Sequence, residues 1–155
     1  MTCYEKLLQD VTDAGIDVRE NIPFESRSDG LIKGNKIGLS KNLKTSIEKR
    51  CVLAEEYAHY QISSTDIIDL RNFNNRKEER KARLLTYNRL IGLRGLIDAY
   101  NHKCKTLHDV AEYLEVTEEF LAEALECYRN KYGICAPIDN YIVYFEPTLG
   151  VLERK

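Results

Sequence analysis

Two different periods of apolar residues mark the first forty positions of the chain. Residues 2–14 carry apolar side chains three or four positions apart, which predicts an amphipathic helix. These side chains are Tyr4, Leu7, Leu8 and Val11. Gly15 stands where such a helix is expected to end. A short strand is predicted at 16–18, and Gly30–Leu39 is typical of a β-hairpin that turns at Gly34-Asn35.

Two long helices are predicted in the middle of the chain. The first begins at residues 45–48, Thr-Ser-Ile-Glu, a capping box whose side chains satisfy the free amides of a helix start. It runs to about Ile62. The second is predicted over residues 75–100, where Gly92 and Gly95 are expected to bend or split it. Its apolar positions are Leu84, Leu85, Leu90, Ile91, Leu96 and Ile97.

The last fifty residues predict a helix-turn-helix unit followed by strands. Residues 107–132 have two helical patterns, with Val116 in the turn and Thr117 capping the second helix. Tyr141–Phe145 is a β-branched and aromatic run, which favours a strand. Gly150–Leu152 is expected to pair with that strand after a turn.

Length and composition favour one globular domain. A chain of 155 residues can bury a core without disulfides or a structural metal, and 43% hydrophobic and 31% charged residues are typical of a soluble protein. We therefore expect a single α+β domain over 1–155, mostly helical with a small β-sheet. Its core is expected over 1–105, and the helix-turn-helix-like unit with the C-terminal strands over 106–155.

Charge and cysteine content exclude several classes of protein. The net charge of −2 gives no general attraction to nucleic acid or to anionic membranes. No leader-like segment opens the chain, and no stretch approaches the ~18 apolar residues of a membrane helix, so we expect a cytoplasmic protein. The cysteines form no Cys-x-x-Cys pair and are predicted to be reduced packing residues. They are Cys3, Cys51, Cys104, Cys127 and Cys135.

The helix predicted after residue 45 carries an acidic residue and a histidine on an apolar face. Val52, Glu55, His59 and Ile62 lie at helical spacing on one side. This face is expected to be buried or to line a cleft. Carboxylate and imidazole in such a setting must be hydrogen-bonded, charge-paired or bound to a cation.

The string Glu55-Glu56-Tyr57-Ala58-His59 is similar to the His-Glu-x-x-His signature. In that signature two imidazoles one helical turn apart bind zinc, and the glutamate polarises the bound water as general base. Glu56 keeps the general-base position and His59 the position of the second ligand. Glu55 replaces the first histidine, and its carboxylate is a legitimate zinc ligand. The alternative is that these residues are ordinary surface or capped positions of a helix.

A catalytic zinc needs a third protein ligand, for which Glu79 is the candidate. It opens the string Glu79-Arg80-Lys81-Ala82, where the small Ala82 would permit close helix approach. Glu78 could take the same place, and Asp66 and Asp69 are further alternatives. The competing interpretation is a solvated, ion-paired helix face, because basic residues surround both glutamates.

These strings together resemble the ImmA/IrrE metallo-endopeptidases of mobile elements, prophages and bacterial stress regulators. Members have a small-strand region, a helix with Leu-Ala-His-Glu-Leu-Gly-His-Tyr, a helix opening with Glu-x-x-Ala, and a helix-turn-helix-like unit with a Leu-Ala and Val-Ser pattern. The chain offers Leu53-Ala54-Glu55-Glu56-Tyr57-Ala58-His59-Tyr60, Glu79-Arg80-Lys81-Ala82, and Asp109-Val110-Ala111 with Val116-Thr117. The resemblance covers most of the chain.

The resemblance implies a zincin-like fold and a zinc-dependent endopeptidase. It implies His59 and Glu79 as metal ligands, Glu56 as general base, and Glu55 at the place of the first ligand. The substrate it implies is a helix-turn-helix repressor of a phage or mobile element. The alternative is a catalytically degenerate member that binds the repressor as a regulator.

Direct DNA binding by the helix-turn-helix-like unit is not expected. Residues 109–126 contain seven acidic residues and no basic one, whereas phosphate contacts favour Lys and Arg. A packing or protein-docking role is predicted instead. The eight Lys or Arg of residues 71–94 are expected to form a solvated helix face. His102 and His108 flank Cys104 at a spacing that matches no zinc module, which favours a role at a helix end or turn.

Overall fold

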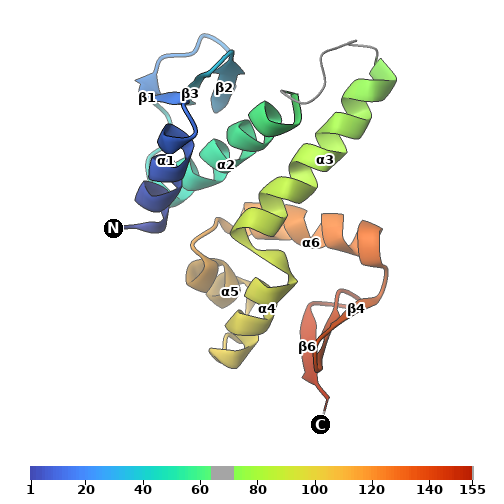
Figure 1. Ribbon diagram of the computed structural model, residues 1–155. Coiled ribbons are helices and arrows are strands. Elements are labelled where there is room, and N and C mark those ends of the chain that lie inside the picture. Colours follow the sequence, from blue (N-terminus) through green and yellow to red (C-terminus); the bar gives the residue numbers. More distant parts are fainter. Residues whose placement is uncertain (64–71, 155) are drawn as a thin grey trace. The chain divides into compact units, whose positions relative to one another are not determined.

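The computed structural model describes residues 1–63 and 72–154, apart from the side chains of residues 72–75 (Figure 1). The chain forms two compact units, Met1–Thr86 and Tyr87–Lys155. The described residues form helices and two three-stranded sheets, joined by loops. This confirms the α+β class. None of the described helices is both long enough and apolar enough to cross a membrane.

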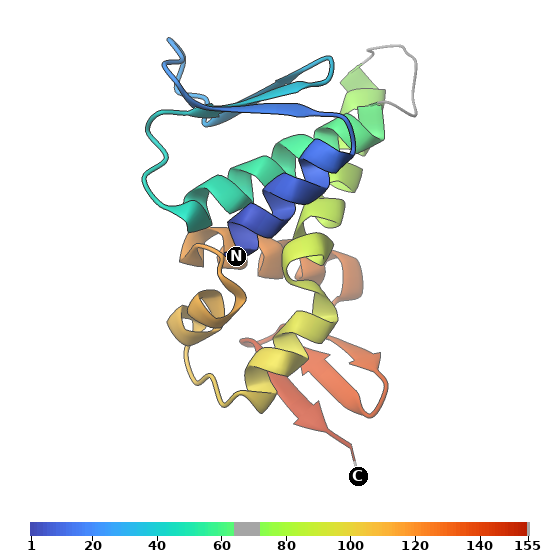
Figure 2. The same cartoon turned by 60° about the vertical axis from the view of Figure 1, so that its left-hand side comes forward.

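Unit 1 combines a small sheet with helices. In chain order its elements are α1 (Cys3–Asp13), β1 (Asp17–Ile22), β2 (Gly30–Lys33), β3 (Lys36–Ser40), α2 (Ser46–Ser63) and the first part of α3 (Asn72–Leu90). The sheet order is β1-β3-β2, with β1 parallel and β2 antiparallel to β3. Figure 2 shows α1 and α2 together on one face of this sheet.

Local sequence signals account for the start of unit 1. Thr2 and Glu5 form a capping box at the start of α1. Gly15, at φ +90°, follows the helix where its end was predicted. The predicted hairpin is confirmed as β2 and β3. The Thr45 hydroxyl accepts a hydrogen bond from the Glu48 amide at 3.1 Å at the start of α2. The element that carries the motif therefore begins where its cap predicts.

The second long helix is split, as the glycine pattern predicts. The structure has α3 to Leu90 and then α4 (Gly92–Asn101), with Gly92 at φ +67°, a conformation that favours glycine. The hydroxyl of the buried Tyr128 forms hydrogen bonds to residues on both sides of this break. It accepts a hydrogen bond from the Gly92 amide at 3.1 Å and donates one to Asn88 Oδ1 at 3.0 Å.

Unit 2 runs from Tyr87 through α4 and confirms the predicted helix-turn-helix. Its further elements are α5 (Leu107–Leu114), α6 (Glu118–Tyr132), β4 (Cys135–Ile138), β5 (Tyr141–Tyr144) and β6 (Gly150–Glu153). Phe120, Leu121 and Leu125 of α6 are buried, as a packing role requires. Both predicted C-terminal strands form, as β5 and β6.

The strand β4 was not predicted from the sequence. It has no strong pattern, because it is short and contains the exposed Pro137, a residue that sheets accept mainly at their edges. The two compact units meet after Thr86, within α3. The expected single domain with a subdivision after residue 105 stays a prediction.

Candidate metal centre

The motif helix α2 packs against the start of β2. A Cβ atom added to Gly30 would lie 2.6 Å from Val52 Cγ1 and 3.1 Å from Glu56 Cγ. Only a residue without a side chain permits this approach. Glu56 is thereby enclosed between helix and strand, and its side chain is only 14% exposed.

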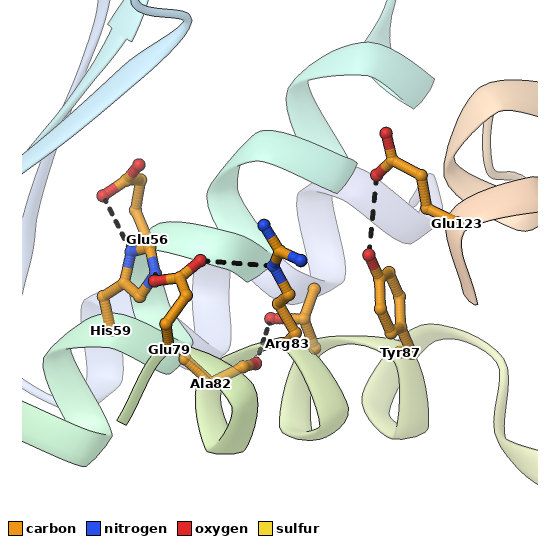
Figure 3. Close-up of polar contacts among 8 residues, drawn as sticks. Glu56, His59, Glu79, Ala82, Arg83, Tyr87 and Glu123 are labelled. Atoms are coloured by element: carbon orange, nitrogen blue, oxygen red, sulfur yellow. Dashed lines mark hydrogen bonds and ion pairs between the residues drawn. The ribbon is translucent and has the colours of Figure 1, made fainter. Parts of the chain in front are cut away.

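His59 has a carboxylate beside each of its ring nitrogens. Nε2 lies 3.1 Å from Glu79 Oε2, at hydrogen-bonding distance, and Nδ1 lies 3.7 Å from Glu56 Oε2, an ion-pair distance. Figure 3 shows the imidazole between the two acids. The structure thus brings together Glu56 and His59 of α2 and Glu79 of α3. His59 and Glu79 are twenty positions apart along the chain.

The two carboxylates raise the pKa of His59 above its ordinary value of 6.5. The contact with Glu56 is the largest cause, and the charge of Glu79 adds to it, whereas partial burial of the ring opposes the rise. The side chain is 35% exposed. In the metal-free protein the surroundings therefore favour the imidazolium form.

Arg83 makes a second contact with Glu79. Its Nε donates a hydrogen bond to Glu79 Oε1 at 3.3 Å from one turn further along α3. Neither Arg83 nor Gly30 was predicted as a residue of the site. The i,i+4 spacing was a signal for Arg83, whereas the close approach at Gly30 depends on how β2 packs.

The buried stripe of α2 differs from the predicted one. The fully buried residues are Cys51, Leu53, Ala54 and Ala58. The face with Val52, Glu55, His59 and Ile62 is half-buried throughout, so it is not the buried side of the helix, and the alternative that it lines a cleft stays a prediction. Small side chains on the other face allow α2 to pack closely against α1 and the sheet.

A family model for the peptidase family M78, described as the IrrE N-terminal-like domain, matches residues 11–126. This range includes the motif helix, Glu79 and the helix-turn-helix. The chain belongs to the ImmA/IrrE family. No curated protein and no solved structure matches the chain. The peptidase family suggests a metallopeptidase and in general depends on zinc.

The contact between His59 and Glu79 fits the zinc chemistry of the ImmA/IrrE family. Two ligands of one tetrahedral zinc, each bonded at about 2.0–2.1 Å, lie about 3.3 Å apart. The separation of 3.1 Å between His59 Nε2 and Glu79 Oε2 is close to this value. An imidazole nitrogen and a carboxylate oxygen are both ligands that zinc accepts.

The ligand roles of Glu55 and of the alternative Glu78 stay predictions. Glu55 is half-buried one turn before His59, and Glu78 is half-buried beside Glu79. Within residues 1–63 and 72–154, no group of three or more His, Cys, Asp or Glu side chains is arranged to hold a metal ion. Asp66 and Asp69 lie outside the described residues.

The two histidines of unit 2 have separate partners. The His102 ring lies at the C-terminal cap of α4 and contacts the Tyr113 ring with centroids 4.5 Å apart. His108 lies between Glu118, at 3.1 Å, and Glu112, at 3.5 Å. The predicted role of His102 at a helix end is confirmed.

Proposed function

We propose that this ImmA/IrrE protein is a zinc-dependent endopeptidase that acts on a helix-turn-helix repressor of a phage or mobile element. The observation that carries the proposal is the 3.1 Å contact between His59 Nε2 and Glu79 Oε2. It joins two helices at the positions where the motif and the following Glu-x-x-Ala string predict ligands. A third ligand oxygen would come from Glu55, which shares a helix face with His59.

Each side chain of such a site would have its own role. Bound zinc would supply a Lewis acid for the peptide carbonyl and would acidify water. His59 and Glu79 would hold the ion. Glu56 would take the proton of the attacking water at its carboxylate and later give it to the leaving amine.

The position of Glu56 also orients the imidazole. When Nε2 binds a cation, the Glu56 carboxylate near Nδ1 would favour the tautomer that keeps its proton on Nδ1. The lone pair of Nε2 then faces Glu79 and is available to a cation. Carboxylate partners of this kind fix the orientation of histidine ligands and raise their basicity.

The sheet edge beside Glu56 favours a peptide as substrate. β2 is an outer strand of the described sheet, and its first residue, Gly30, packs beside Glu56. An extended peptide can add to such an edge through main-chain hydrogen bonds. Pairing with β2 near Gly30 would bring a peptide beside the part of α2 that carries the proposed base.

The test is cleavage of the helix-turn-helix repressor of the same genetic element. Purified zinc-loaded protein should convert the repressor into two fragments that mass spectrometry identifies, and a chelator should stop the reaction. Glu56→Gln should lose at least about a hundredfold in rate, because it removes the base. Glu119→Gln, an exposed carboxylate on α6, is the matched control and should retain the rate. Equal rates for both variants would contradict the assignment of Glu56.

The second candidate is a regulator that binds the repressor without cleaving it. It is favoured by Glu55 at the first ligand position and by the lack of a three-ligand group among the described residues. In that case the zinc-loaded protein would form a stable complex with an intact repressor, and Glu56→Gln would bind equally well. A regulator that binds DNA itself would instead show strongly salt-dependent binding to duplex DNA.

A further inference from the structure

Arg83 contacts the proposed ligand Glu79 on the oxygen that His59 does not use. Its Nε donates to Glu79 Oε1 at 3.3 Å, while Glu79 Oε2 lies 3.1 Å from His59 Nε2. Figure 3 shows the carboxylate between the guanidinium and the imidazole. We propose that Arg83 is a positioning residue that keeps Glu79 Oε2 directed at His59 and at the cation. This inference rests on the proposed function.

The exposed Glu79 carboxylate needs a contact that keeps it in one orientation. The Glu79 side chain is 47% exposed and lies on the solvent side of α3, so burial alone does not select one rotamer. A glutamate side chain has several accessible rotamers, and ordering it costs conformational entropy. Hydrogen bonds to a ligating carboxylate reduce this cost by ordering it before the cation arrives. Arg83 makes such a bond from a planar donor group.

The way α3 packs sets this contact. Ala82 and Thr86 are each only 1% exposed, and the Thr86 hydroxyl donates to the Ala82 carbonyl at 2.7 Å. These two residues lie on the buried side of the helix. Glu79 and Arg83 have the same i,i+4 spacing on the adjoining exposed side, where residues one turn apart are neighbours. The pair is therefore positioned by the helix itself.

If Arg83 acted only through its charge, its removal would change the metal affinity in the opposite direction. A guanidinium near a bound cation repels it, so a purely electrostatic Arg83 would weaken metal binding and its removal would strengthen it. Positioning predicts weaker binding after removal. The Arg83 side chain is 65% exposed, and exposed ion pairs contribute little to folding stability. Variants at this position should therefore fold, and the sign of the change in affinity separates the two roles.

The experiment is a Co²⁺ and Zn²⁺ titration of the full chain at fixed ionic strength. Arg83→Ala should bind about tenfold more weakly than wild type, and Arg83→Lys should recover part of the loss. The visible spectrum of bound Co²⁺, which reports its ligands, should also change in Arg83→Ala. Arg80→Ala is the matched control, because it removes the same charge from an exposed neighbour of Glu79, and it should bind no more weakly than wild type.

Each other outcome overturns a stated part of the account. Equal or tighter binding by Arg83→Ala overturns the role of Arg83 and leaves the metal centre standing. Equal weakening in Arg83→Ala and Arg80→Ala also overturns it, because no specific contact is then involved. If wild type binds neither Co²⁺ nor Zn²⁺, the proposed function fails together with this inference.

Discussion

His59 and Glu79 are twenty positions apart in the sequence, and His59 Nε2 lies 3.1 Å from Glu79 Oε2. The contact requires that α2 and α3 lie side by side at this point, so it is a tertiary relationship and not a consequence of helical spacing. It makes Glu79 a direct partner of the motif histidine, and the choice between Glu79 and its neighbour Glu78 as metal ligand stays a prediction. The metal proposal depends on this pair.

The choice between the two adjacent glutamates can be tested by binding. Glu79→Gln should lower Zn²⁺ affinity by at least about tenfold, because an amide is a poorer ligand than a carboxylate. Glu78→Gln removes the same charge one position away and should change affinity by much less. Isothermal titration calorimetry of both variants with Zn²⁺ measures the two affinities. A larger loss in Glu78→Gln would mean that the ligand is misassigned.

The stability of the metal-free protein should depend on the protonation of His59. Its pKa is raised in the folded state, so the imidazolium stabilises the fold fully below the unfolded pKa of about 6.5. This contribution is lost as the pH rises through the raised folded value. In the presence of a chelator, wild type should exceed His59→Gln in free energy of unfolding by more at about pH 5.5 than at about pH 8.5.

Urea titrations of both proteins at the two pH values measure this difference. The comparison with His59→Gln removes the effects of other titrating groups, since both proteins carry them. A difference that grows toward high pH would show that the two carboxylates do not favour the charged imidazole.

Gly30 should tolerate no side chain. In Gly30→Ala the new methyl group would lie 2.6 Å from Val52 Cγ1, so β2 or α2 must shift. We expect a loss of about 1–3 kcal/mol in the free energy of unfolding. Gly150→Ala is the control, because its nearest atom would lie at 3.9 Å, an ordinary contact. Equal stability of both variants would contradict the close packing of β2 on the motif helix.

Tyr128→Phe should destabilise unit 2. The buried hydroxyl bonds to the Gly92 amide and to Asn88, so its loss leaves a backbone donor without that partner. A cost of about 1–3 kcal/mol is expected. Tyr132→Phe, which keeps the ring packing against Phe145, is the control and should cost less. Thermal unfolding of both variants provides the measurement.

Local sequence patterns predicted those parts of the fold whose signals are local. The end of α1 before Gly15, the β2–β3 hairpin, the split at Gly92 and the helix-turn-helix all depend on residues within a few positions of one another. The strand β4 was missed because Pro137 and its short length hide the pattern. The buried side of α2 did not follow from the apolar spacing, because its buried residues are Cys51, Leu53, Ala54 and Ala58, whereas the face with Glu55 and His59 is half-buried.

The candidate site was predictable only in its components. The string Glu55-Glu56-Tyr57-Ala58-His59 identified the helix and its chemistry, and Glu79, with Glu78 as an alternative, was the candidate for a third ligand. Neither prediction gives the distance between His59 and Glu79 or the approach of Gly30 to Glu56, because both depend on packing between elements. The arrangement of Glu55 with these residues remains a prediction.

The most direct test of the metal centre is the zinc content of the purified protein, measured by elemental analysis of wild type beside His59→Ala. The account predicts about one zinc per wild-type chain and a large loss in the variant, because His59 supplies the only nitrogen ligand. Lys49→Ala, on the same helix but paired with Glu20, should retain the metal. Equal zinc in wild type and His59→Ala would contradict the central claim.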